Sequence, residues 1–487
     1  MASSIRRNYI YNVLLNVSRV IFPLITAPYI SRVLEPDGVG LFNFSNTYAG
    51  YFALFALLGI PTYGIREVAK VQGDKEKLSR LISELVSLSL LTTLAVTVIY
   101  LCSLVLIGQL RENHVIFLLS GFALYLAPFR MDWFFSGVEQ FKFITLRTLV
   151  IRTVSIVCMF AFVHTKCDLI IYVILNVAGT VGGDIWNFVK LLSLGIRPRL
   201  VFSGLRKHLS PLFVLFTASV AISIYTVLDT LMLGFMTDYR EVGFYNNAMH
   251  ISKTLLMVVT SLSVVAIPRI SQYNKEGGYE RINELVNKSL SVVAFLSVPI
   301  AFGVACIAPT FVPLFFGVEF GGSVLPLMIL SFLVVAIGLN NLFGMQILVA
   351  MSKDKLFLRS ILVGTATNFL LNLLLIPLYG AVGASVSSVV AEFLIVVVMA
   401  VFIYQSTPVR FSHSWLDLVK SLIGSVLFIP IAWMLSRWIG GWMLVFAFII
   451  CGGLLFCVLQ KLCKHSAVEL LMPIVQSRFS FISCWGK

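Results

Sequence analysis

Three ionisable side chains lie deep inside long apolar stretches of the sequence: Arg19, Lys253 and Asp229. Such a group near the middle of a membrane-spanning helix costs about 2.5 to 3.5 kcal/mol, so those present should face a partner or a water-filled cavity. Arg19 follows Asn12 and Asn16 at the spacing i, i+4, i+7, which places the three side chains on one face of a helix. We expect that face to be polar while the rest of the helix contacts lipid.

Lys253 stands in a similar pattern, because Asn246 and His250 precede it at helical spacing. A lumen lined by these cations would be electropositive and would bind a phosphate-bearing anion through charge-assisted hydrogen bonds. A neighbouring lysine disfavours the charged form of His250, so we do not expect a proton relay there. The predicted binding residues are Arg19, Lys253, Asn12, Asn16, Asn246, His250 and Arg130.

Two acidic residues, Asp229 and Glu392, leave two roles open. Each could carry a proton or a sodium ion, or could pair with a cation such as Arg19 and hold it in place. Arg130 also has an alternative, an interfacial ion pair with Asp132 where a span meets the cytoplasm.

The composition requires the bilayer as solvent, which excludes a soluble globular protein. Mean hydropathy is +0.96, and 59% of the 487 residues are hydrophobic while 12% are charged. Most of the 36 Lys and Arg residues fall in alternate loops, on the side of the N-terminus, so we predict that both termini are cytoplasmic. The net charge of +14 therefore serves topology and attraction to anionic lipid heads, and no nucleic acid partner is expected.

About 14 apolar segments are long enough to span a membrane at roughly 20 residues each. They are placed near residues 9–30, 42–64, 82–108, 115–135, 144–163, 169–192, 211–234, 244–267, 289–309, 323–348, 360–378, 383–403, 418–436 and 442–460. The first two segments form a hairpin joined by the turn at residues 32–40.

A pattern near residue 40 returns in the second half of the chain. ValGly at 39–40 precedes Leu-Phe-Asn, ValGly at 242–243 precedes Phe-Tyr-Asn, and Arg66 matches Arg269 at the same offset. A duplicated bundle is a common way for transporters to build a site between two halves. We predict an all-α fold with pseudo-symmetric six-helix bundles at 1–197 and 198–403 around a central cavity. Two further spans and a cytoplasmic tail would occupy 404–487.

Motifs typical of enzymes are missing. The sequence has no GxxxxGK[ST], GxSxG or HExxH motif, and its loops are too short for a separate catalytic domain. Its eight cysteines include no CxxC pair, so neither a disulfide framework nor a metal site is indicated. We expect no catalytic residue, no cofactor and no bound metal.

Two runs in the first hairpin carry a family resemblance: LITAPYISRVLEPDGVGLFNFSNTYAGYF and LLGIPTYGIREVAK. They resemble the N-terminal signature of the Wzx-type polysaccharide-transport flippases, which translocate O-antigen repeat units. These belong to the multidrug/oligosaccharidyl-lipid/polysaccharide exporter (MOP) superfamily. The match is specific over residues 8–80 and extends over the remaining chain in hydropathy. The turn departs slightly, with LEPDGVG in place of the commoner LGPEGIG.

The resemblance implies a flippase of the bacterial inner membrane that works by alternating access. Its substrate would be undecaprenyl-diphosphate-linked oligosaccharide, moved from the cytoplasmic to the periplasmic leaflet, with the diphosphate held by Arg19 and Lys253. Arg32, Arg66 and Glu67 match the family pattern near span ends and are interpreted as gate or topology residues. Membrane lipids, a polysaccharide polymerase and a chain-length regulator are the further partners considered.

Two alternatives stay open. A cation-coupled multidrug exporter of the same superfamily would favour acidic residues in its lumen, and the cations argue against it. A membrane glycosyltransferase or polymerase of polysaccharide assembly would need a long periplasmic loop, and no predicted loop on that side has the length.

Overall fold

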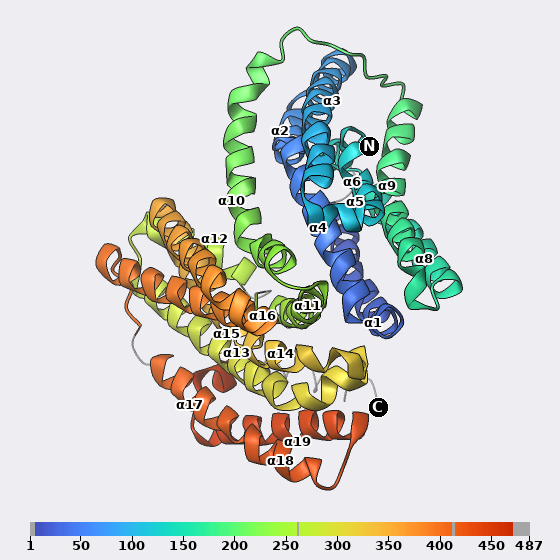
Figure 1. Ribbon diagram of the computed structural model, residues 1–487. Coiled ribbons are helices and arrows are strands. Elements are labelled where there is room, and N and C mark those ends of the chain that lie inside the picture. Colours follow the sequence, from blue (N-terminus) through green and yellow to red (C-terminus); the bar gives the residue numbers. More distant parts are fainter. Residues whose placement is uncertain (1–4, 261–262, 412–413, 471–487) are drawn as a thin grey trace, which may run out of the picture. The chain divides into compact units, whose positions relative to one another are not determined.

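The computed structural model describes residues 5–260, 263–411 and 414–470, and it contains helices and no strand within those ranges. The chain forms two compact units, Met1–Gly243 and Phe244–Lys487. The first unit holds α1 (Ile5–Leu57), α2 (Ile60–Val71), α3 (Lys75–Leu106), α4 (Gly108–Glu112), α5 (His114–Ser120), α6 (Phe122–Tyr125), η1 (Ala127–Phe129), α7 (Asp132–Gly137), α8 (Phe141–Phe162), η2 (Lys166–Asp168), α9 (Leu169–Ser193), α10 (Arg206–Met236) and the start of α11 (Tyr239–Thr260) (Figure 1).

The second unit begins within α11. It then holds α12 (Ser263–Glu276), α13 (Tyr279–Phe316), η3 (Val318–Ser323), α14 (Val324–Leu330), α15 (Leu333–Asn340), the π-helix η4 (Asn341–Val349), α16 (Asp354–Ser406), α17 (Ser414–Val426), α18 (Phe428–Ser436) and α19 (Gly441–Leu462). The predicted bundle boundaries at residues 197 and 403 stay predictions. In the first unit α10 packs against α1 and α2.

Two of the longest helices are each broken once. In α1 the backbone leaves the helical region at Glu35 (φ 58°, ψ 175°), immediately before Pro36, which cannot donate a helical hydrogen bond. In α16 the break is at Gly380 (φ 53°, ψ −128°), where a positive φ favours glycine. The predicted turn of the first hairpin lies at the Glu35 break.

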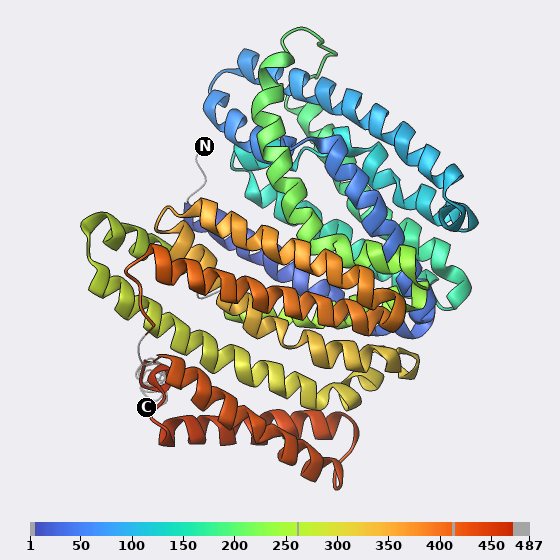
Figure 2. The ribbon, with the colours of Figure 1, turned by 60° about the vertical axis from the view of Figure 1, so that its left-hand side comes forward.

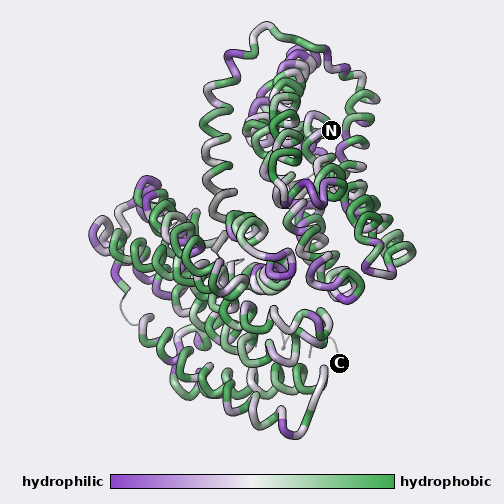
Figure 3. Tube along the Cα trace, viewed as in Figure 1, coloured by the Kyte–Doolittle hydropathy of each residue, from purple (hydrophilic) through white to green (hydrophobic). Residues whose placement is uncertain are grey.

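Nine helices in the described part of the chain are long and apolar enough to cross a membrane. Each of the two broken helices covers a pair of predicted spans, and shorter apolar helices at His114–Phe129 and Val227–Met236 overlap two more. The multi-pass α-helical class is therefore confirmed, while the number of 14 spans stays a prediction. Figure 3 shows apolar residues along most of each long helix and hydrophilic residues mainly toward helix ends and loops.

The outer faces of these helices expose large apolar side chains, as expected for a protein surrounded by lipid. Leu94, Val98 and Val105 of α3 are exposed, while Ile82 and Leu85 of the same helix are fully buried. Because the bilayer core offers no hydrogen bonds, exposed apolar side chains and satisfied helical backbones are the stable arrangement there.

Each unit has its own apolar core. In the first, Ile60, Ile82, Phe134 and Phe135 belong to a cluster built from α2, α3 and α7. In the second, α13 is the central helix and packs against α12, α14, α15 and the last three helices. Figure 2 shows α13 running between α16 and the α17–α19 group.

Candidate functional site

The structure describes two of the three side chains on the predicted polar face of α1. Asn12 and Asn16 are exposed, and Asn16 Nδ2 lies 3.4 Å from Asn12 Oδ1, so the two amides share a face as their spacing predicts. Arg19 lies one turn further along α1, but its side chain is outside the described residues.

The predicted polar face of the second half lies on α11. Lys253 is exposed, and Asn246 and His250 are half-buried. Thr254 donates its hydroxyl to the His250 carbonyl at 2.8 Å. Arg19 belongs to the first compact unit and Lys253 to the second. A cationic cavity lined by both stays a prediction.

Arg130 belongs to a charged network with different partners from the predicted one. Arg130 Nε lies 3.3 Å from Asp184 Oδ2, whereas Asp132 pairs with Arg147 Nη2 at 3.0 Å and accepts from Asn187 Nδ2 at 2.8 Å. Sequence reasoning missed Arg147, whose side chain is only 6% exposed and whose guanidinium also donates to the Gly183 carbonyl. The sequence feature that could have identified it is the position of this arginine inside the predicted fifth span, residues 144–163.

The two candidate ion-coupling residues lie on different helices. Asp229 is half-buried in α10. Glu392 is 6% exposed in α16 and accepts a hydrogen bond from the Asn340 amide, which also donates to the Glu392 carbonyl at 3.3 Å. Asn340 ends α15 directly before the π-helix η4, and single π turns inside helices often mark functional positions. Coupling or charge pairing by these acids stays a prediction.

The predicted gate residues lie near helix ends. Arg32 is exposed in α1, before the Glu35 break. In α2, Glu67 accepts from Arg66 Nε at 3.1 Å and from Lys70 Nζ at 2.8 Å. Partial burial acts to raise the pKa of Glu67, but the hydrogen bonds from Lys70 and Arg66 outweigh it and hold that pKa below its usual value. Glu67 thus stays ionised and fixes two exposed cations at the end of α2.

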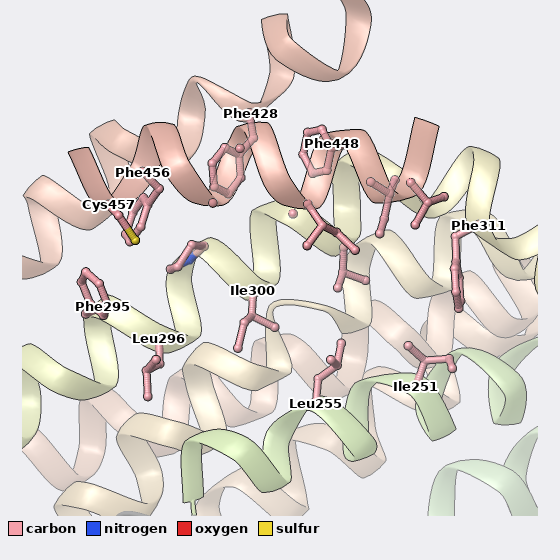
Figure 4. A pocket seen from close by; sticks show the side chains of 18 residues that line it. Ile251, Leu255, Phe295, Leu296, Ile300, Phe311, Phe428, Phe448, Phe456 and Cys457 are labelled. Atoms are coloured by element: carbon pink, nitrogen blue, oxygen red, sulfur yellow. The ribbon is translucent and has the colours of Figure 1, made fainter. Parts of the chain in front are cut away.

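Sequence reasoning also missed an apolar groove within the second unit. It has a volume of about 520 Å³ and lies between α11, α13, α18 and α19 (Figure 4). Its walls include Ile251, Leu255, Leu296, Ile300, Phe448 and Ile449. Gly303, Gly452 and Gly453 add no side chains to the wall and so leave room between the helices. Glycines within apolar spans were the sequence feature that could have indicated this groove.

The groove is partly open to the surroundings, because Ile449 and Cys457 of its wall remain exposed. Near the turn that joins α18 and α19, three tryptophans are exposed: Trp433, Trp438 and Trp442. Exposed tryptophans are typical of the boundary between hydrocarbon and head groups. The groove is lined by apolar residues of two long apolar helices, α13 and α19, and its wall therefore suits an apolar chain.

The long apolar helices define a multi-pass α-helical membrane protein. The chain belongs to the family described as polysaccharide biosynthesis protein, whose model matches residues 5–274. It is 26% identical over 406 residues to a protein of Escherichia coli (strain K12) named as an O-antigen transporter, which covers 82% of this chain and 97% of that protein.

The fold is similar to two solved structures. One is the lipid II flippase MurJ in an inward closed conformation, with a TM-score of 0.73 and 15% identity, covering 94% of this chain and 100% of that one. The other is an inward-facing MATE family multidrug resistance transporter of the MOP superfamily, with a TM-score of 0.60 and 13% identity, covering 81% and 97%. The predicted resemblance is thus confirmed at the level of the polysaccharide biosynthesis protein family, and the chain shares its fold with both solved structures.

Proposed function

We propose that the protein moves undecaprenyl-diphosphate-linked oligosaccharide, an O-antigen or related repeat unit, from the cytoplasmic to the periplasmic leaflet of a bacterial inner membrane. Movement occurs by alternating access. Arg19 and Lys253 hold the diphosphate in a cationic cavity, with Asn12, Asn16 and Asn246 as further polar contacts. Both termini remain cytoplasmic.

The observation that carries the proposal is the apolar groove of about 520 Å³. Residues of α13 line it from Phe295 to Phe311, and these two positions lie about 24 Å apart along the helix at 1.5 Å per residue. That length is most of a hydrocarbon core of roughly 30 Å. A polyprenyl chain can lie in the groove along α13 while its anionic head group crosses elsewhere.

The direction of movement follows from charge. An inside-negative potential assists the outward movement of the anionic diphosphate by about 2.3 kcal/mol per charge per 100 mV. A coupling ion on Asp229 or Glu392 would add to this drive but is not required by it.

The test is complementation of a strain that lacks its own O-unit flippase, with surface polysaccharide as the readout at matched membrane expression. Ile449→Trp fills the groove and should abolish transport. Ile450→Trp is the matched control, because Ile450 is the next residue of α19, is 59% exposed against 55% for Ile449, and is absent from the groove wall. Equal transport by both variants would exclude the groove as the chain site.

The head-group site is tested in the same assay. Loss of one charge-assisted contact should lower transport about tenfold in Arg19→Ala and in Lys253→Ala, with partial rescue by Arg19→Lys. Lys77→Ala is the control, because that lysine is 73% exposed and pairs with Asp74 at a helix start. Wild-type transport by both cation variants would overturn the cavity assignment. Efflux of a cationic dye by a wild type that fails to complement would favour the drug-exporter alternative.

A further inference from the structure

Two phenylalanines pack together at one end of the apolar groove. Phe295 of α13 and Phe456 of α19 have ring centroids 5.3 Å apart, and Phe456 also packs against Phe428 at 6.1 Å. Figure 4 shows Phe295, Phe456 and Cys457 together at one end of the groove, with Phe311 toward the other. We call Phe295 and Phe456 the aromatic floor.

A buried polar cluster lies directly behind the floor. The His465 ring lies 5.5 Å from Phe295, and its Nε2 lies 3.1 Å from both Ser421 Oγ and the Asp417 carbonyl oxygen. Asp417, 1% exposed, accepts from Ser291 Oγ at 2.7 Å and from Lys420 Nζ at 3.0 Å.

The cluster makes the floor a true end for an apolar chain. Burial lowers the pKa of His465, against the opposing charge of Asp417, so the ring packs on Phe295 as a neutral group. A chain pushed past the floor would separate buried hydrogen-bonded groups, and each such loss is unfavourable.

The position of Phe456 is set by a close approach of α17. A Cβ added at Gly424 would lie 3.2 Å from Phe456 Cδ2 and 2.5 Å from Gln460 Nε2. Gln460 in turn donates to the Lys420 carbonyl at 2.9 Å. The floor therefore packs against α17, which carries Gly424 as well as Asp417 and Ser421 of the polar cluster.

We propose that Phe295 and Phe456 determine how much of the prenyl chain the protein contacts, and so act as specificity-determining residues for chain length. This inference rests on the proposed occupancy of the groove by the chain. Affinity should rise with each isoprene unit until the chain reaches the floor, and further units should add nothing because they lie in lipid or detergent.

The floor can be moved in both directions. Phe456→Ala removes part of it and should shift the plateau of affinity to longer chains. Ile300→Phe places an aromatic ring four residues beyond Leu296, about 6 Å further along α13, and should shift the plateau to shorter chains. Opposite shifts are not expected from general destabilisation, which would lower all affinities together.

The measurement is native mass spectrometry of the full-length protein with polyprenyl monophosphates from farnesyl to undecaprenyl. Phe446→Ala is the control, because Phe446 lies on α19, is 61% exposed and does not line the groove. It should keep the wild-type plateau. Unchanged plateaus in both floor variants would overturn the inference while leaving chain binding intact. If the affinity of the wild-type protein did not depend on chain length, the prenyl chain would not occupy the groove, and both the proposed function of the groove and this inference would be overturned.

Discussion

At the scale of single residues, the charged network around Arg147 gives a stability prediction. Replacing Arg147 by Ala removes its bond to Asp132 and its donation to the Gly183 carbonyl, both at 3.0 Å, from a site where the guanidinium is buried. Breaking a buried pair costs about 3 to 5 kcal/mol. Because the Asp132 side chain is 48% exposed, screening by solvent lowers our expectation to about 2 kcal/mol.

Thermal unfolding of the purified protein in detergent checks this value. The matched control is Arg111→Ala, an exposed arginine at the end of α4, which should change the midpoint little. Equal midpoints for the two variants would show that the network contributes no stability. An intermediate value for Arg147→Lys would identify the charge as one part of the effect and the forked geometry of arginine as the other.

At the scale of elements, two serines of α3 fix the segment that leads into α10. Ser83 Oγ accepts from the Arg199 amide at 3.1 Å, and Ser87 Oγ accepts from the Val201 amide at 2.9 Å. We expect Ser83→Ala with Ser87→Ala to free these amides, so that their hydrogen exchange accelerates while exchange in α3 stays slow.

The comparison variant is Ser89→Ala in the same helix. Ser89 is buried, and its hydroxyl has no hydrogen-bond partner among the residues that the structure describes. Peptide-level hydrogen exchange of residues 194–205 should therefore match wild type in that variant. Unchanged exchange in the double variant would mean that the segment is held by other contacts, such as those of Lys207 and His208 with the buried Glu84.

What sequence alone could predict also differs between elements. The predicted turn at residues 32–40 contains the break in α1, and helical spacing placed Asn12 beside Asn16, because both depend on local backbone geometry. The pairing of Arg147 with Asp132 and of Arg130 with Asp184 depends on which helices pack together, which spacing does not encode. The groove is a space between four helices, so its apolar wall residues are indistinguishable in sequence from those that face lipid.

At the scale of the whole molecule, the glycines of the repeated ValGly pattern allow two backbone segments to approach each other closely. Within the first unit, a Cβ on Gly40 would lie 1.7 Å from the Tyr239 carbonyl oxygen, and a Cβ on Gly243 would lie 2.3 Å from the Pro36 carbonyl oxygen. Each copy of the pattern thus places its glycine against the backbone that precedes the glycine of the other copy. The reciprocity agrees with the predicted duplication, which stays a prediction.

These contacts lead to opposite expectations for two glycine substitutions in α1. Gly40→Ala forces two backbones apart and should lower the free energy of unfolding by about 1 to 3 kcal/mol, as overpacking does. At Gly50 an added Cβ meets no atom within 4 Å in the described part of the chain. Because alanine favours helix over glycine by roughly 0.5 to 1 kcal/mol, Gly50→Ala should raise stability. Thermal unfolding of both variants in detergent decides the matter, since a Gly40→Ala protein as stable as Gly50→Ala would show that the two backbones do not need this close approach.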